Sequence, residues 1–202
     1  GKRVLLIDHQ DSFVHTLAGY LRETGAEVLT LRSGFPLQRL SELAPDLVLL
    51  SPGPGSPKDF GLQDTLAALQ ERGIATFGVC LGLQGMAEYF GGSLAILPKP
   101  MHGVRSTVRV LGGRLFEGLP NSFTVGRYHS LYAQRHSLPK ELEITAESED
   151  GVVMAIEHRT LPMAAVQFHP ESILTLEERR GHTLLHNVLR RLVPGARRAP
   201  AA

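Results

Sequence analysis

Short apolar runs alternate with longer amphipathic stretches along the first half of the chain. Apolar runs bounded by turn residues are typical of buried strands, and apolar positions spaced three or four apart are typical of helices. The pattern predicts strands at residues 4–8, 26–31, 46–50 and 74–79, and helices at 11–23, 37–43, 62–72 and 81–90. Alternation of strand and helix builds a parallel sheet with helices on both faces.

The second half of the chain changes character. Its predicted strands are short and separated by turn residues, and they lie at 105–111, 122–127, 142–148, 152–158 and 164–168. The first four of these strands are expected to extend the sheet in an antiparallel or mixed manner, and the strand at 164–168 is expected to be buried. A final helix is predicted at 176–192. The sequence thus predicts one α/β domain over residues 1–192, with an open, mostly parallel central sheet, and a disordered tail at 193–202.

Composition narrows the classes of protein that fit. A chain of 202 residues with 43% hydrophobic residues can bury a full core, and its formal net charge of +1 favours neither nucleic acid nor an anionic membrane as a partner. No apolar run approaches the ~20 residues that span a bilayer. A single cysteine excludes an internal disulfide, so a cytoplasmic location is expected.

The single cysteine, Cys80, lies at a position typical of a catalytic nucleophile. Cys80 follows the apolar strand at 74–79 and precedes the helix at 81–90, with Gly78 and Gly82 two residues to either side. This is the strand–nucleophile–helix elbow of G-x-S-x-G enzymes with sulfur in place of oxygen. The first turn of a helix favours a thiolate. A buried core thiol is the alternative for a lone cysteine.

Two further segments supply partners for a cysteine nucleophile. The strand at 164–168 leads into His169-Pro170-Glu171, and a histidine with a carboxylate completes a Cys-His-Glu triad. The loop Ser51–Pro57 follows the strand at 46–50, where the ligand crevice of an open α/β sheet lies. Its backbone N–H groups and that of Leu81 are candidates for an oxyanion hole.

Four motifs occur in the order PGPG, GVCLGLQ, YHSL and QFHPES. In that order the chain resembles the triad-type glutamine amidotransferase domain, over nearly its whole length from Val4 to Leu192. The resemblance implies a flavodoxin-like fold, and hydrolysis of L-glutamine with ammonia passed to a synthase. The segments IDHQDSF and HSL look most like the glutaminases of anthranilate synthase and aminodeoxychorismate synthase. The segments DHQDSFVHTLAGYLRETGAEV and FGVCLGLQGMAEYFGG look closest to the form that is fused behind the chorismate-using domain of anthranilate synthase.

The resemblance also implies roles for particular residues. The catalytic triad would be Cys80, His169 and Glu171. The oxyanion hole and the glutamine site would be formed by Gly53, Pro54, Gly55, Leu81, Gln84, Ser130 and Leu131. The glutaminase step would need no metal or organic cofactor, and Mg would be expected only on the synthase partner. Leu83 stands where this branch commonly carries His, which departs from the pattern without touching the triad.

Several alternatives remain open at this stage. The synthase partner could belong to the tryptophan branch or to the folate branch, in cis or in trans, and a non-catalytic domain of the same fold is a third possibility. A cysteine peptidase or esterase is disfavoured by Gln84 and the HSL segment. His182 and His186 share a helix face but lack the third ligand of a zinc site. The loop positions suggest a partner surface formed by His9, Gln10, Met101, His102 and Tyr132.

Overall fold

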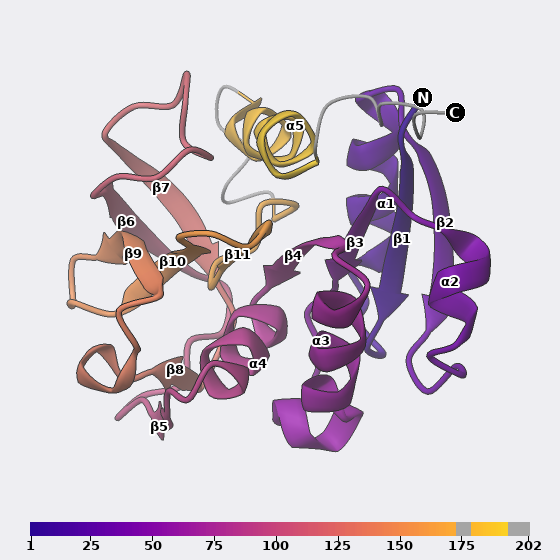
Figure 1. Cartoon of the computed structure of the whole chain (residues 1–202). Coiled ribbons are helices and arrows are strands. Elements are labelled where there is room, and N and C mark those ends of the chain that lie inside the picture. Colours follow the sequence, from indigo (N-terminus) through magenta and orange to yellow (C-terminus); the bar gives the residue numbers. More distant parts are fainter. Residues whose placement is uncertain (173–178, 194–202) are drawn as a thin grey trace.

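A computed structural model of the chain describes residues 1–172 and 179–193 (Figure 1). The described residues form a nine-stranded sheet, in which five neighbouring strands are parallel. In spatial order, these five are β2 (Glu27–Arg32), β1 (Arg3–Asp8), β3 (Leu47–Leu50), β4 (Ala75–Val79) and β11 (Met163–Val166). The sheet continues, antiparallel, through β10 (Val153–His158), β9 (Leu142–Ser148), β6 (Val104–Val110) and β7 (Ser122–Arg127).

Helices cover both faces of the parallel part (Figure 1). One face packs against α1 (Val14–Glu23) and α5 (Arg180–Leu192), and the other packs against α2 (Arg39–Leu43), α3 (Leu62–Glu71) and α4 (Leu81–Tyr89). Each face has its own apolar core, because successive side chains of a strand point to opposite sides of the sheet. Leu6 of β1 lies in the core beneath α1, and Leu5 lies in the core beneath α3.

The predicted fold class is confirmed, including the antiparallel extension. Two features were not predicted. The strands β5 (Leu94–Ile96) and β8 (Leu131–Ala133) pair as a separate small sheet, and the short 3-10 helices η1 (Pro57–Phe60) and η2 (Arg135–Ser137) interrupt loops. The predicted helical residues 176–178 and residues 194–202 of the predicted tail lie outside the described part of the chain.

The start of α1 differs from the prediction. The sequence pattern begins this helix at residue 11, with Asp11 and Ser12 as caps, but the helix begins at Val14 and Phe13 occupies the N-cap position without a side-chain cap. The carboxylate of Asp11 instead accepts a hydrogen bond from the backbone N–H of Phe13, at 2.8 Å. A turn before the helix therefore takes the hydrogen bond that a capping residue would have made.

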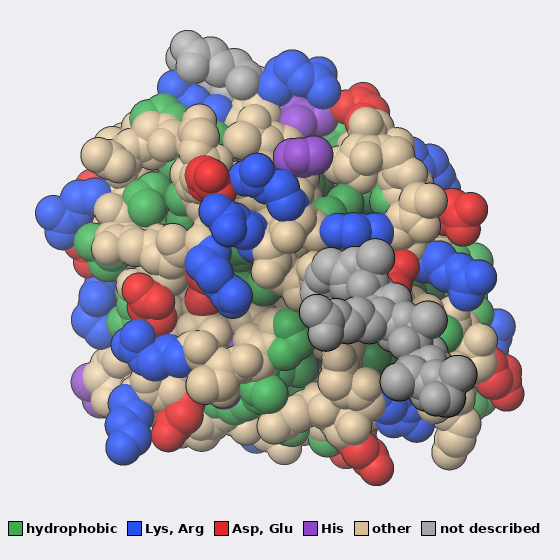
Figure 2. All heavy atoms as spheres, turned by 45° about the horizontal axis from the view of Figure 1, so that its top comes forward, with side chains coloured by type: hydrophobic (Ala, Val, Ile, Leu, Met, Phe, Trp, Pro, Cys, Tyr) green, Lys and Arg blue, Asp and Glu red, His purple; other side chains and the backbone are tan. Residues whose placement is uncertain are grey.

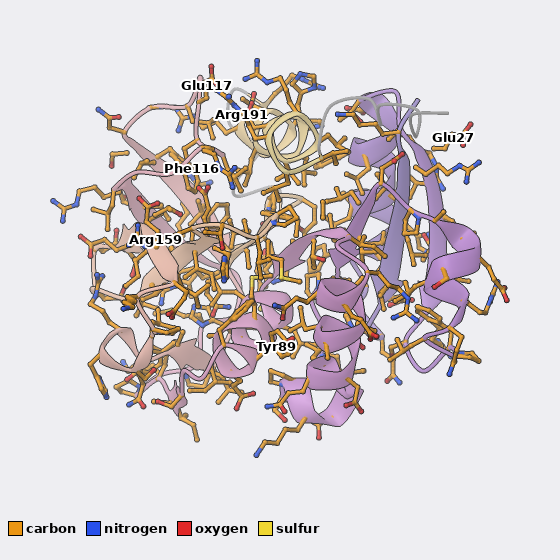
Figure 3. The ribbon with its side chains drawn as sticks, viewed as in Figure 1. Glu27, Tyr89, Phe116, Glu117, Arg159 and Arg191 are labelled. Atoms are coloured by element: carbon orange, nitrogen blue, oxygen red, sulfur yellow. The ribbon has the colours of Figure 1, made fainter. Side chains whose placement is uncertain are left out.

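Charges on the surface are mixed and in part paired. Figure 2 shows basic and acidic side chains interspersed over one face of the molecule. Arg190 and Arg191 of α5 both form ion pairs with Glu117, and Figure 3 shows Arg191 and Glu117 side by side. No helix among the described residues is long and apolar enough to cross a membrane.

The helix α4 packs closely on the sheet at the two glycines around the cysteine. A Cβ placed on Gly78 would lie 2.6 Å from the carbonyl carbon of Gly82, and one placed on Gly82 would lie 3.2 Å from Leu50. The first distance is shorter than a real Cβ contact and the second is tight, so a side chain at either position would push α4 away from the sheet. Gly78 therefore sets how closely α4 packs on β4, and Gly82 sets how closely it packs on β3.

We predict that Gly78→Ala destabilises the fold by at least about 1–3 kcal/mol, as overpacking a core does. Urea unfolding would measure the loss. Gly19→Ala is the matched control, because a Cβ added to Gly19 of α1 would meet no neighbouring element within 4 Å, and a helical Gly→Ala change stabilises by up to about 1 kcal/mol. A Gly78→Ala protein as stable as wild type would contradict this account of the junction.

Candidate active site

Cys80 sits between β4 and α4 in a backbone conformation that few residues adopt. Its φ is +55° and its ψ is −94°. The conformation is held by hydrogen bonds on both sides: the N–H of Cys80 donates to Val166 O at 2.8 Å, and the N–H of Gln84 donates to Cys80 O at 3.2 Å. Such strained residues cluster at functional sites and persist only where their surroundings fix them. The thiol thus lies at the N-terminus of α4, where partial positive charge favours an anion.

His169 and Glu171 form a buried pair just beyond β11. The distance between His169 Nδ1 and Glu171 Oε1 is 2.6 Å, and both side chains are almost fully buried. Burial alone would lower the pKa of His169, but the charge of Glu171 and the interaction with Cys80 raise that pKa well above its ordinary value. Within the described residues, His169 Nε2 has no hydrogen-bond partner, so this atom is left to exchange a proton with the thiol.

Aromatic rings fix the orientation of the imidazole. The ring centroids of Tyr128 and Phe13 lie 4.8 Å and 5.5 Å from that of His169. Tyr128 also approaches the nucleophile, since its carbonyl oxygen lies 3.7 Å from Cys80 Sγ as the acceptor of the thiol proton. The His169 ring is therefore packed against two aromatic side chains that also contact each other, with ring centroids 5.5 Å apart.

A cavity of about 260 Å³ opens beside Cys80. It is lined by Gly53, Pro54, Gly55, Cys80, Gln84, Pro100, Met101, His102, Tyr128, His129, Ser130 and Leu131. The set contains seven of the ten residues that the sequence suggested for the site. The other three do not line the cavity: Leu81 is the first residue of α4, directly after Cys80, and His169 and Glu171 are buried.

The loop Ser51–Pro57 is anchored at its base by His9. The N–H of His9 donates to Ser51 Oγ at 2.9 Å, and His9 Nδ1 lies 3.0 Å from Ser51 O. A Cβ on Gly53 would lie 2.6 Å from His9 O, so only glycine permits this packing. The suggestion that His9 belongs to a partner surface is wrong, because the side chain is 1% exposed and points into the protein under the loop.

The far end of the same loop is fixed by a capping box. The N–H of Ser56 donates to Asp59 Oδ2 at 2.8 Å at the start of η1, and the Ser56 side chain takes part in the reciprocal contact. Gly55 stands before it with φ of +75°, a conformation that favours glycine. Both ends of the loop are thus held, and its middle faces the cavity.

The opposite wall of the cavity is held by His129. Its Nδ1 donates to Leu131 O at 2.7 Å, and its Nε2 accepts from Arg127 Nε at 3.0 Å. Arg127 is itself buried and donates to Ser106 Oγ and Asp150 Oδ1 at 3.2 Å and 2.8 Å. Burial, together with the charge of Arg127, lowers the pKa of His129 to about 4 against the pull of the Leu131 bond. The neutral ring is hydrogen-bonded at both nitrogens and so fixes this part of the cavity wall.

One residue of the site was given no role by the sequence. Gln167 follows β11, is fully buried, and donates a hydrogen bond from Nε2 to Cys80 Sγ at 3.4 Å. Its Oε1 accepts from Gln84 Nε2, also at 3.4 Å. The signal in the sequence was a single polar residue within an otherwise apolar strand, Ala164–Phe168. A buried amide in such a strand must find hydrogen-bond partners.

The two histidines of α5 have other surroundings. His182 Nε2 lies 3.2 Å from Glu23 Oε2, and the His182 ring packs on Tyr20 with centroids 3.9 Å apart. Within the described residues, no group of three or more His, Cys, Asp or Glu side chains could hold a metal ion.

A cysteine on a strand–helix elbow, a buried His–Glu pair and a cavity on the carboxyl edge of a flavodoxin-like sheet define the class of triad-type cysteine amidases. The family model for class-I glutamine amidotransferases matches residues 5–191. The chain belongs to the class-I glutamine amidotransferase family.

Two relatives agree with this placement, and a solved structure shares the fold. The chain is 62% identical to an anthranilate synthase from Azospirillum brasilense, over 97% of this chain and 27% of the relative. It is 50% identical to an aminodeoxychorismate synthase from Streptomyces griseus, over 92% of this chain and 25% of the relative. The chain therefore spans about a quarter of the length of each. A glutamine amidotransferase from Thermotoga maritima shares the fold, with a TM-score of 0.74 and 18% identity, over 96% of this chain and 99% of that one.

The lowered pKa of His129 predicts an acid-sensitive fold. Between pH 6.5 and pH 4 the unfolded chain binds a proton at this position and the folded chain does not, so the stability that the neutral ring contributes is present above pH 6.5 and is lost as the pH falls toward 4. The loss amounts to at most about 3 kcal/mol. Urea unfolding of wild type and His129→Gln at pH 7 and pH 4.5 would measure it. The stability gap between the two proteins should narrow at pH 4.5, and a gap independent of pH would contradict the prediction.

Proposed function

We propose that this chain hydrolyses L-glutamine to glutamate through a thioester on Cys80 and delivers the ammonia to a chorismate-using synthase. The observation that carries the proposal is the meeting of the strained Cys80 and the buried His169–Glu171 pair beside the cavity that Gln84 lines. Membership of the glutamine amidotransferase family supplies the substrate class.

The reaction begins with transfer of the thiol proton to His169. The raised pKa of His169 favours the imidazolium and leaves a thiolate beside it, and Glu171 stabilises the positive charge through Nδ1. The thiolate attacks the side-chain carboxamide carbon of glutamine and forms an S–C bond. The imidazolium then gives its proton to the leaving nitrogen, and the C–N bond breaks to release ammonia. Water, with its proton taken by His169, hydrolyses the γ-glutamyl thioester and restores the thiol.

The oxyanion of each tetrahedral intermediate needs hydrogen-bond donors on the side of the sulfur away from His169. The N–H of Leu81 opens α4, where the first N–H groups of a helix have no partner within the helix. The loop of Gly53, Pro54 and Gly55 lies across the cavity. We assign the oxyanion to the backbone N–H groups of Leu81, Gly53 and Gly55, because Pro54 has no N–H to donate. We assign the α-amino and α-carboxylate groups of glutamine to Gln84 and the backbone of Ser130 and Leu131.

The higher identity to an anthranilate synthase favours that enzyme's chorismate-using domain or subunit as the partner, in cis or in trans, and a role in tryptophan biosynthesis. The aminodeoxychorismate synthase relative keeps the folate branch as the second candidate. The glutaminase step uses side chains and backbone of this chain without a cofactor, and Mg belongs to the synthase partner. A cytoplasmic location accompanies this role. The intact geometry around Cys80 disfavours a non-catalytic binding domain.

Replacing the nucleophile tests the glutaminase directly. Cys80→Ala should reduce ammonia release from glutamine by at least about 10⁴-fold, because removing a nucleophile leaves only the binding contributions. Gln134→Leu is the control, since Gln134 bonds Ser93 Oγ outside the cavity and should keep full activity. Enzyme-coupled detection of glutamate measures turnover, and thermal unfolding verifies the fold. Wild-type turnover by Cys80→Ala would refute the assignment.

Partner identity is tested by reconstitution. Ammonia release from glutamine should rise when an anthranilate synthase chorismate-using component and chorismate are added to the chain, because closing loops over a site completes it. The corresponding aminodeoxychorismate synthase component, at the same concentration, should raise it less. A larger response to the second component would move the chain to the folate branch.

A further inference from the structure

The orientation of two side-chain amides beside the nucleophile follows from one backbone carbonyl. Leu131 O can only accept hydrogen bonds, and Gln84 lies 3.0 Å from it, so the nearer atom of the Gln84 amide must be Nε2. His129 Nδ1 donates to the same carbonyl. The position of Leu131 O therefore fixes which way the Gln84 side chain is turned.

Gln84 in turn fixes the orientation of Gln167. The second proton of Gln84 Nε2 points at the Gln167 amide, 3.4 Å away, and needs an acceptor, so that atom is Oε1. The Nε2 of Gln167 is then the atom that faces Cys80 Sγ, at 3.4 Å. The donor direction is set by the chain of bonds from Leu131 to the sulfur.

We propose that Gln167 is a further catalytic residue, whose side-chain N–H donates a hydrogen bond to the Cys80 thiolate. The hydrogen bond to the sulfur is independent of the proposed function, and only its role in glutamine hydrolysis rests on that function. Gln167 is held in place from both ends: its own backbone N–H donates to Met154 O at 2.8 Å, and its side chain is fully buried. A buried donor that cannot turn away bonds more strongly to a charged acceptor than to a neutral one.

The hydrogen bond acts at two points of the reaction. Before attack, it stabilises the sulfur anion together with the imidazolium of His169. In the hydrolysis of the thioester, water adds to the acyl carbon, the C–S bond breaks, and the sulfur leaves with the electron pair as a thiolate. Gln167 stabilises that leaving group as it forms. The amide itself neither gains nor loses a proton.

Gln167 also links the nucleophile to the substrate site. Gln84, which lines the cavity, bonds to Leu131 on one side and to Gln167 on the other. A shift of the wall at Leu131 therefore reaches the sulfur through two side-chain amides. The charged group that interacts with the sulfur is His169, and its charge interacts in turn with Glu171 and with Asp11 before α1.

Alkylation of Cys80 by iodoacetamide tests the proposal without glutamine turnover. Gln167→Met keeps the length of the side chain and removes the donor. At neutral pH the variant should be alkylated about ten- to a hundredfold more slowly than wild type, the range expected for a lost hydrogen bond to a charged group. At alkaline pH, where the thiol is ionised in both proteins, the two rates should converge. Cys80 is the only cysteine, so mass spectrometry reads its modification alone.

Glutamine kinetics supply the second readout. Gln167→Met should lower kcat by about ten- to a hundredfold with a smaller change in KM, because the lost interaction is with the reacting atom. Gln167→Glu covers the case in which Met disturbs folding: it keeps the acceptor for Gln84 and loses the N–H, so it should slow alkylation as well. Gln134→Leu is the control for replacing a glutamine residue elsewhere in the chain, and this variant should behave like wild type in both assays.

The outcomes separate the two claims. Alkylation at the wild-type rate by folded Gln167→Met, or slowing by the same factor at every pH, would overturn the role of Gln167. Slow alkylation at neutral pH that recovers at alkaline pH supports the role even if wild type fails to hydrolyse glutamine, and that failure would count against the proposed function alone.

Discussion

The backbone of Cys80 is the constraint on which the active site depends. With φ of +55° the residue turns the chain out of β4 and into α4 within one position, which places the thiol at the carboxyl edge of the sheet and at the N-terminus of the helix together. The conformation survives because the N–H of Cys80 bonds to Val166 on β11 and because Gly78 and Gly82 let the helix lie against the strand. Relaxing any of these contacts would move the sulfur relative to His169.

The antiparallel half of the sheet builds the other side of the site. Near the end of β7 the carbonyl of Gly126 accepts a hydrogen bond from the backbone N–H of His169, and the chain then continues along the wall of the cavity. The buried Arg127 and the neutral His129 hold this stretch from beneath. The extension thus links the position of the catalytic base to the shape of the substrate cavity. Both halves of the sheet contribute to a single cavity beside Cys80, although their strands lie far apart in the sequence.

The sequence predicted those features that local pattern controls. Apolar runs located the strands to within a few residues, and the glycines around Cys80 located the elbow. Each of these signals is local, because the residues that make it up lie within a few positions of one another. The hydrogen bond from Gln167 to Cys80 joins residues 87 positions apart, and the hydrogen bond between His9 and Ser51 joins residues 42 positions apart. The pairing of β5 with β8 also depends on distant contacts. Such features follow from tertiary packing, which a single sequence does not reveal.

The central claim is that Cys80 carries the glutamyl group during turnover. The most direct measurement mixes the protein with glutamine, stops the reaction in acid within the first turnovers, and examines the peptides by mass spectrometry. We expect a γ-glutamyl adduct on the peptide that contains Cys80, at a level that decays once glutamine is exhausted. Continued release of ammonia with an unmodified Cys80 peptide at every time point would contradict the claim.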